Sequence, residues 1–292
     1  MKLTPEDLHN LAGQACHAAT KAGALIASYH DQEVTVEEKT VSVGDTLASQ
    51  VVTEVDHRSE EVILDCLAPS IERYDLAVLT EEREDDRSRL TKDHFWCIDP
   101  LDGTLPLTRG LPGYAISIAL VRQDGHPLIG VVLDPVTEKL YRAVVGGGIQ
   151  INGVPFKSTN SVGGPLKFFC DCNFSEHPER EVLIGLVNTI ANREGYTGVE
   201  VIEGAGAVLN ACRVLEEGPA IYFKKPKSKK GGGSLWDFAA TACLFEQAGL
   251  HAADFAGRTL QLNQRESTFM NQRGVCYAST LRLAAALRGE PV

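Results

Sequence analysis

Apolar residues in the first half of the chain follow two patterns, a helical spacing and short continuous runs. After the capping and acidic start Thr4-Pro5-Glu6-Asp7 they recur every three to four positions, which predicts one long helix from Pro5 to His30. A second helix is predicted from His57 to Leu67, ended before Pro69. Short apolar runs bounded by turn residues predict strands near residues 34–36, 76–80, 95–98, 114–122, 128–133 and 139–145. We therefore expect an α+β lobe with a multi-stranded, mainly antiparallel sheet.

The pattern changes at Ser158 to Pro165, a run of Ser, Thr, Asn, Gly and Pro that is typical of a connection. Beyond this run strands and helices alternate, which favours a smaller α/β lobe. The predicted strands are 167–172, 199–202 and 220–223, and the predicted helices are 178–192, 205–216 and 237–247. We therefore assign the chain to the α/β class, with an N-terminal α+β lobe at residues 1–160 and a C-terminal α/β lobe at residues 161–292.

Composition narrows the class of protein. The 292 residues carry a formal net charge of −11, which argues against a nucleic-acid polymer as partner, because such binding requires a basic surface. No stretch approaches the roughly 20 apolar residues of a membrane span, and the N-terminus lacks the pattern of a signal peptide. The 8 cysteines show no zinc-knuckle spacing. We expect a reduced, cytoplasmic protein, in which the charged run from Arg83 to Lys92 forms a solvated loop.

The stretch from Trp96 to Thr104 carries the strongest chemical signal. It reads as a buried strand from Phe95 to Ile98 that is stopped by Pro100, whose bend can turn Asp99 and Asp102 toward one point with the Leu101 carbonyl between them. Gly103 allows close approach to a ligand, and Thr104 can open a helix with free N–H groups. Carboxylates and a carbonyl suit hard cations, and free amides suit a phosphate.

Two further acids follow similar signals. Glu81 comes directly after an apolar strand, as Asp99 does, so neighbouring strands can bring the two together. Asp237 follows a glycine-rich run and opens an alanine-rich helix. Each can instead be a turn residue or a helix cap, and for Asp237 the two interpretations are equally favoured. Converging carboxylates repel one another unless cations neutralise them.

Three motifs together resemble the inositol monophosphatase superfamily. They are Glu81-Glu82, Asp99-Pro100-Leu101-Asp102-Gly103-Thr104 and Trp236-Asp237-Phe238-Ala239-Ala240, in the family's order and over nearly the whole chain. That superfamily also includes 3'(2'),5'-bisphosphate nucleotidases and fructose-1,6-bisphosphatases. The resemblance implies a layered α/β/α/β/α sandwich of the sugar phosphatase type, a possible homodimer and inhibition by lithium.

The resemblance also implies roles for individual residues. Glu81, Asp99, the Leu101 carbonyl, Asp102 and Asp237 would hold two or three Mg²⁺ ions. Glu81 and Thr104 would orient the attacking water or accept its proton. Asp56 matches a family aspartate near the third metal, although it can also be an N-cap of the helix that follows. The implied substrate-binding residues are Asp102, Gly103, Thr104, Gly206, Lys224 and Asp237.

The substrate is predicted to be a small phosphorylated metabolite, with two subfamilies in competition. Lys224 lies where bisphosphate nucleotidases carry a basic residue, which favours hydrolysis of 3'-phosphoadenosine 5'-phosphate to AMP. The apolar segment Gly204 to Val208, which includes Gly206, is closer to the inositol phosphatase pattern. Inositol-1-phosphate and fructose-1,6-bisphosphate are therefore the alternative substrates. A protein of another class, which binds metal or a phosphorylated ligand without catalysis, is the remaining alternative.

Overall fold

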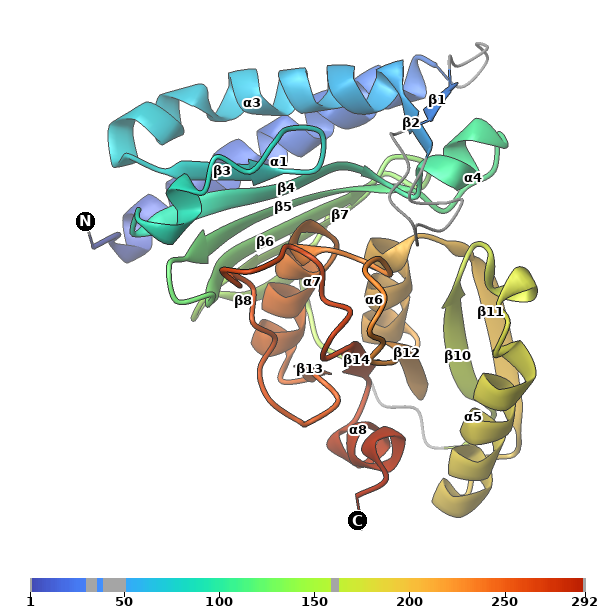
Figure 1. The fold of residues 1–292 in the computed structure, drawn as a ribbon. Coiled ribbons are helices and arrows are strands. Elements are labelled where there is room, and N and C mark those ends of the chain that lie inside the picture. The colour runs from blue at the N-terminus through green and yellow to red at the C-terminus, as the bar shows by residue number, and fades with distance from the viewer. Residues whose placement is uncertain (1, 30–35, 39–50, 159–162, 291–292) are drawn as a thin grey trace.

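The computed structural model describes residues 2–29, 36–38, 51–158 and 163–290, and it confirms the layered α/β/α/β/α architecture (Figure 1). Two sheets alternate with three pairs of helices. The outer pair on the first sheet is α1 (Pro5–Ala27) and α3 (Glu54–Tyr74), the pair between the sheets is α6 (Ala207–Glu216) and α7 (Leu235–Ala248), and the outer pair on the second sheet is α5 (Arg180–Glu194) and α8 (Leu281–Arg288).

The first sheet has its strands in chain order. Only β3 and β4 pair in parallel, and the other neighbours are antiparallel, as the sequence predicted. The strands are β3 (Ala77–Thr80), β4 (His94–Asp102), β5 (Ala115–Arg122), β6 (Pro127–Asp134), β7 (Lys139–Val144), β8 (Gly148–Ile151) and β9 (Val154–Phe156). A separate ribbon pairs β1 (Val36–Glu38) with β2 (Val51–Thr53), and the predicted strand near residues 34 and 35 lies outside the described residues.

The second sheet is mixed. β10 is parallel to both of its neighbours, whereas β14 is antiparallel to β12 and β13. Its strand order is β11 (Val199–Ala205), β10 (Leu166–Asp171), β12 (Ala220–Lys224), β14 (Val275–Ala278) and β13 (His251–Ala253). β13, β14 and α8 were not predicted from the sequence. One buried core joins both sheets through α6 and α7, so the division of the chain at residue 160 remains an interpretation.

Burial of both faces explains why the central strands read as continuous apolar runs. On β4, Trp96 and Ile98 pack in the core beneath α1 and α3, while Phe95 and Cys97 face the core that contains α6 and α7. Successive side chains of a strand point to opposite faces, so a strand between two helical layers needs apolar residues at every position. No described helix is long and apolar enough to cross a membrane.

The second helix is longer than the sequence indicated. α3 continues through Pro69 to Tyr74, because its last turns bury two side chains that make specific contacts. Ser70 Oγ accepts a hydrogen bond from Trp96 Nε1 at 3.1 Å, and Tyr74 donates its hydroxyl to Asp7 on α1 at 2.7 Å. The tertiary contacts outweigh the loss of one backbone hydrogen bond at Pro69.

The charged run after β3 is not simply a solvated loop. It contains a turn of 3₁₀ helix at Ser88–Leu90, and the Arg89 side chain is only 1% exposed. Its guanidinium pairs with Asp85 at 2.8 Å and donates to the Gln264 carbonyl at 2.9 Å. A fully hydrogen-bonded arginine can be buried, and here it ties the run to the C-terminal part of the chain.

Candidate metal centre

A bulge in β4 brings Asp99 and Asp102 to the same face of the first sheet. The sequence predicted that Pro100 would stop the strand at Ile98, but β4 continues to Asp102 with all of its residues buried. Asp99 lies opposite Ser117 and Asp102 opposite Ala115, so β4 advances by three residues where β5 advances by two. Without the extra residue an odd and an even position would face opposite sides. A bulge also tolerates the missing N–H of proline.

Asp237 joins these two carboxylates from α7. It is the third residue of that helix, and its side chain accepts the backbone N–H of Ser234 at the helix start. One carboxylate oxygen from each of Asp99, Asp102 and Asp237 lies within 4.8 Å of the others, and we call these three residues the acid cluster. The structure therefore brings together three of the acids that the sequence singled out, from β4 and from α7.

Glu81 follows the strand that lies next to β4. That strand is β3, which pairs in parallel with β4 so that Thr80 is opposite Ile98, and the two strands therefore end side by side. After burial, the Glu81 charge is the largest cause that raises the pKa of Asp99. It also raises the pKa of Asp237. The pairing of β3 with β4 and this electrostatic influence together support a position of Glu81 near the cluster, although Glu81 is not one of the three residues whose oxygens lie within 4.8 Å of one another.

The acid cluster is electrostatically unfavourable without a cation. Burial first, and then neighbouring carboxylates, hold the pKa values of Asp99 and Asp102 well above the ordinary aspartate value. Burial raises the pKa of Asp237 to about 6. Among the described residues Asp99 Oδ2 has no hydrogen-bond partner although it is buried, while Oδ1 accepts the Leu101 N–H at 3.0 Å. A buried, unpaired carboxylate oxygen is costly, and a hard cation is the partner that suits it.

Asp102 also connects the first sheet to α6. Its carboxylate accepts the backbone N–H groups of Ala207 and Val208 at 3.2 and 2.9 Å, and thereby caps the N-terminus of α6. A Cβ on Gly206 would lie 2.2 Å from Asp102 Oδ2, so only glycine permits this approach. Gly206 thus touches a residue of the acid cluster, while its role toward a substrate remains a prediction.

Asp56 and Thr104 form a pair next to the cluster. The Thr104 hydroxyl donates to Asp56 Oδ1 at 2.9 Å and lies 3.2 Å from the Leu101 carbonyl oxygen. Burial raises the pKa of Asp56 to about 6, and the Glu81 charge adds to that shift. The N-cap of α3 is Thr53, so the interpretation of Asp56 as the N-cap is wrong. Asp56 is the third residue of the helix, and its side chain completes a capping box with Thr53. After Gly103, with a φ of 87°, Thr104 opens α4 (Thr104–Thr108).

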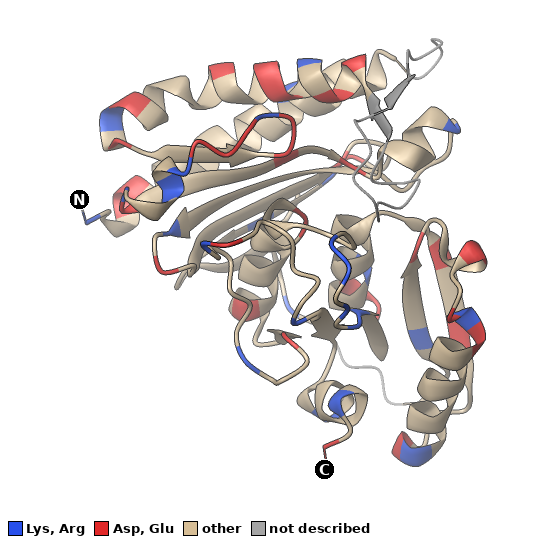
Figure 2. Ribbon diagram, in the orientation of Figure 1, with Lys and Arg blue, Asp and Glu red and all other residues tan. Residues whose placement is uncertain are grey.

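Lys224 ends β12 beside Asp171, which ends β10. The ammonium lies 2.9 Å from Asp171 Oδ2. Burial alone lowers its pKa, but the charges of Asp171, Asp237 and Asp102 raise it above the ordinary lysine value. Its positive charge in turn opposes the rise in the pKa of Asp237. Further lysines follow along the loop between β12 and α7, where Figure 2 shows blue segments.

Two polar residues of α3 that contact the site, Ser59 and Glu60, were not predicted from the sequence. Ser59 Oγ donates to the Pro100 carbonyl at 2.8 Å, and Glu60 accepts the Thr80 hydroxyl at 2.7 Å. Both side chains are buried. The signal lay in their spacing, because Asp56, Ser59 and Glu60 continue the buried stripe of Ile63 and Leu67 at helical period. Polar residues on the apolar face of a helix mark contacts that need partners.

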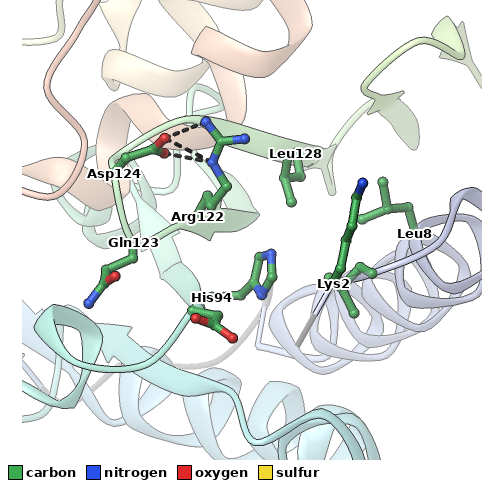
Figure 3. Close-up of a pocket in the computed structure, with 9 residues that line it drawn as sticks. Lys2, Leu8, His94, Arg122, Gln123, Asp124 and Leu128 are labelled. Carbon is green, nitrogen blue, oxygen red and sulfur yellow. Dashed lines mark hydrogen bonds and ion pairs between the residues drawn. The ribbon is translucent and has the colours of Figure 1, made fainter.

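The cavity in Figure 3 lies away from the acid cluster. Its volume is about 540 Å³, and His94, Arg122 and Asp124 line it together with residues near the start of α1. Arg122 Nε donates to Asp124 Oδ1 at 2.8 Å, so these charges are paired. None of the predicted site residues lines this cavity. His94 begins β4, whereas Asp102 ends it, so the two features occupy opposite ends of one strand.

Known proteins resemble the chain over almost its full length. A sequence model of the inositol monophosphatase family matches residues 7–290. The chain is 30% identical over 252 residues to the Nus factor SuhB of Escherichia coli strain K12, covering 86% of this chain and 87% of that protein. It is 34% identical over 250 residues to the Nus factor SuhB of Salmonella typhimurium strain 14028s, with coverage of 86% and 87%.

Two solved structures show the same fold. Staphylococcal inositol monophosphatase-1, soaked in LiCl as an inhibitory complex, superposes with a TM-score of 0.74 at 19% identity over 99% of this chain and 96% of its own. An inositol monophosphatase/NADP phosphatase complexed with NADP and Ca²⁺ superposes with a TM-score of 0.73 at 18% identity, over 98% and 97% of the two chains.

Proposed function

Because the chain belongs to the inositol monophosphatase family, we propose that it is a Mg²⁺-dependent phosphomonoesterase of a small phosphorylated metabolite. The observation that carries this proposal is the acid cluster, in which a buried carboxylate oxygen of Asp99 has no partner among the described residues. Glu81, Asp99, the Leu101 carbonyl, Asp102 and Asp237 would hold two or three ions. Oxygen ligands of this kind suit Mg²⁺.

The residues of the chain would prepare the reaction in three ways. Bound divalent cations lower the pKa of a water ligand and stabilise charge on a departing oxygen. Thr104, held by Asp56 at 2.9 Å, would orient the attacking water, and Glu81 would help to accept its proton. Backbone amides near Gly103 would receive the phosphate.

The arrangement around Lys224 favours a polyol monophosphate such as inositol-1-phosphate over a bisphosphate. The ammonium is already paired with Asp171 at 2.9 Å and shares its charge with Asp102 and Asp237. A substrate with a second phosphate would have to displace this ion pair. Asp171 and Lys224 instead offer an acceptor and a donor that suit hydroxyl groups.

One observation supports a second candidate, a 3'(2'),5'-bisphosphate nucleotidase that converts 3'-phosphoadenosine 5'-phosphate to AMP. The pKa of Lys227 is lowered by partial burial and then by the charges of Lys224 and Lys229. Lysines that repel one another are relieved by an anion, which a second phosphate would supply.

A substrate panel tests both candidates. Phosphate release is measured with inositol-1-phosphate, adenosine 3',5'-bisphosphate, fructose-1,6-bisphosphate and NADP, each with Mg²⁺ and with EDTA. We expect EDTA-sensitive turnover that is fastest with inositol-1-phosphate. A tenfold preference for adenosine 3',5'-bisphosphate would support the nucleotidase instead. Binding of Mg²⁺ and phosphate without turnover of any compound would point to the non-catalytic binding protein.

Other properties implied by the family stay predictions of the same kind. A homodimer is expected in light scattering, and LiCl is expected to inhibit turnover. A cytoplasmic location is expected from the composition and is checked by fractionation of the native cells.

A further inference from the structure

α3 presents a polar face to the interior of the protein. Asp56, Ser59 and Glu60 are 2%, 0% and 3% exposed, and their spacing places them on one side of the helix. Each contacts a different segment of the site. Asp56 accepts from Thr104, Ser59 donates to the Pro100 carbonyl, and Glu60 contacts the end of β3. The first two contacts adjoin residues of the proposed metal centre, which raises the question of what Glu60 supports.

Glu60 bonds to residues on both sides of Glu81. The Thr80 hydroxyl donates to Glu60 Oε2 at 2.7 Å, and Arg83 Nε donates to Glu60 Oε1 at 2.5 Å. Thr80 is the last residue of β3, so the turn that begins at Glu81 lies beyond the strand ladder. One buried carboxylate therefore fixes the entry to this turn and its exit.

Burying a carboxylate to hold a turn costs free energy of desolvation. Its loss of hydration is offset only when its oxygens are hydrogen-bonded, as they are here by a buried hydroxyl and a guanidinium. Apolar residues could anchor a strand end without that cost. A rigid, charge-assisted anchor is valuable where a neighbouring side chain must keep a fixed position, as outer residues do around metal ligands.

We propose that Glu60 is a positioning residue for Glu81, which holds that carboxylate at the edge of the acid cluster so that it can bind a divalent cation. This inference rests on the proposed metal-dependent function. Loss of the Glu60 charge would free the turn through Arg83, and Glu81 would then spend part of its time away from the cluster. The affinity of the protein for the cation would fall, although Glu60 does not touch the cation itself.

Calorimetric titration of the protein with MnCl₂ alone, without substrate, tests this. We expect Glu60→Gln to weaken Mn²⁺ binding about tenfold, the usual effect of an outer partner of a metal ligand. Glu81→Gln should weaken binding at least as much, and the double variant should bind no more weakly than Glu81→Gln, because Glu60 acts through Glu81. The matched control is Glu61→Gln, an exposed neighbour on the same helix, which should bind Mn²⁺ as the unaltered protein does.

The possible results distinguish the positioning role of Glu60 from the proposed metal-dependent function. An unaltered protein that binds no Mn²⁺ contradicts the proposed function. Normal Mn²⁺ affinity in Glu60→Gln, or equal losses from Glu60→Gln with and without Glu81, overturns the positioning role and leaves the function intact. Should Glu60→Gln fail to fold, Thr80→Val removes only the 2.7 Å hydroxyl contact, and it must then weaken Mn²⁺ binding for the proposal to survive.

Discussion

The two ends of β4 differ in their charges: one end has a pair of opposite charges, and the other has several carboxylates close together. At its start, beside His94, the guanidinium of Arg122 pairs with the carboxylate of Asp124 at the rim of the cavity shown in Figure 3. At its end, the acid cluster gathers three carboxylates, with Glu81 nearby and Lys224 as a cation that is shared with Asp171.

The difference shows that charge balance distinguishes the two ends of the strand. An exposed pair of opposite charges is worth about 0–1 kcal/mol and needs no ligand. Buried carboxylates of the same sign are costly and keep raised pKa values until a cation neutralises them. The carboxylates of the cluster therefore need a cation or protons to offset their repulsion, whereas the ion pair at the other end is balanced within the protein.

The sharpest test of this contrast replaces an aspartate by asparagine at each end. Asp102→Asn should lower metal-dependent phosphate release by about 10³-fold, because a charge at the reacting centre is lost. The asparagine oxygen can accept only one of the two N–H groups of α6 that the carboxylate now accepts, so circular dichroism and the melting temperature must first show that the fold is kept. Asp124→Asn at the other end should stay within about twofold of the unaltered protein. Near-normal turnover in Asp102→Asn would remove the acid cluster from the mechanism.

Without metal, the stability of the protein should depend on pH, because the buried carboxylates repel one another when they are charged. The native carboxyls of Asp56 and Asp237, each with a pKa of about 6, bind protons that the unfolded chain has already released. The free energy of unfolding of the metal-free protein therefore loses about 3 kcal/mol per such group as pH rises from 4 to 7. With Mg²⁺ present this loss should shrink. We expect the difference in melting temperature between Mg²⁺ and EDTA to widen with pH, and a constant difference would argue against metal at these carboxylates.

Gly206→Ala probes the approach of α6 to the cluster. A Cβ 2.2 Å from Asp102 Oδ2 must push the carboxylate or the helix aside, at a cost of about 1–3 kcal/mol of stability. Phosphate release should fall about tenfold, since a shift of the cluster misplaces its oxygens. Gly185→Ala is the control, because nothing lies within 4 Å of a Cβ at that exposed site of α5. Equal activities of the two variants would show that Asp102 does not depend on this packing.

Lys224→Met should have the smallest effect on Mg²⁺ binding, and it distinguishes between the two candidate substrates. Loss of the ammonium beside the cluster should tighten Mg²⁺ binding by about threefold to tenfold, because a competing positive charge is gone. Lys225→Met, at an exposed neighbouring position, should leave Mg²⁺ affinity unchanged. Turnover of adenosine 3',5'-bisphosphate and of inositol-1-phosphate is measured on the same variants. A loss confined to the bisphosphate would favour the nucleotidase.

Local signals were sufficient to predict most elements. Pro5 after a capping threonine began α1, and Gly249 in the left-handed region ended α7, because helix ends are set by a few neighbouring groups. They failed at Pro69 and at Arg89. At Pro69 the contact of Tyr74 with Asp7 outweighed the local preference, and at Arg89 the hydrogen bond to Gln264 did so. These partners lie far away in the sequence, so local patterns do not reveal them.

The sequence singled out the acids, through the motif at residues 99–104 and, for Glu81 and Asp237, through the resemblance of three motifs to a known family. Tertiary structure decided how they meet. It set the bulge that turns Asp99 and Asp102 to one face, the pairing of Lys224 with Asp171, and the buried support from Ser59 and Glu60. These depend on strand register and on packing between segments far apart in sequence, where the free energy is shared among contacts that form only when the whole fold is assembled.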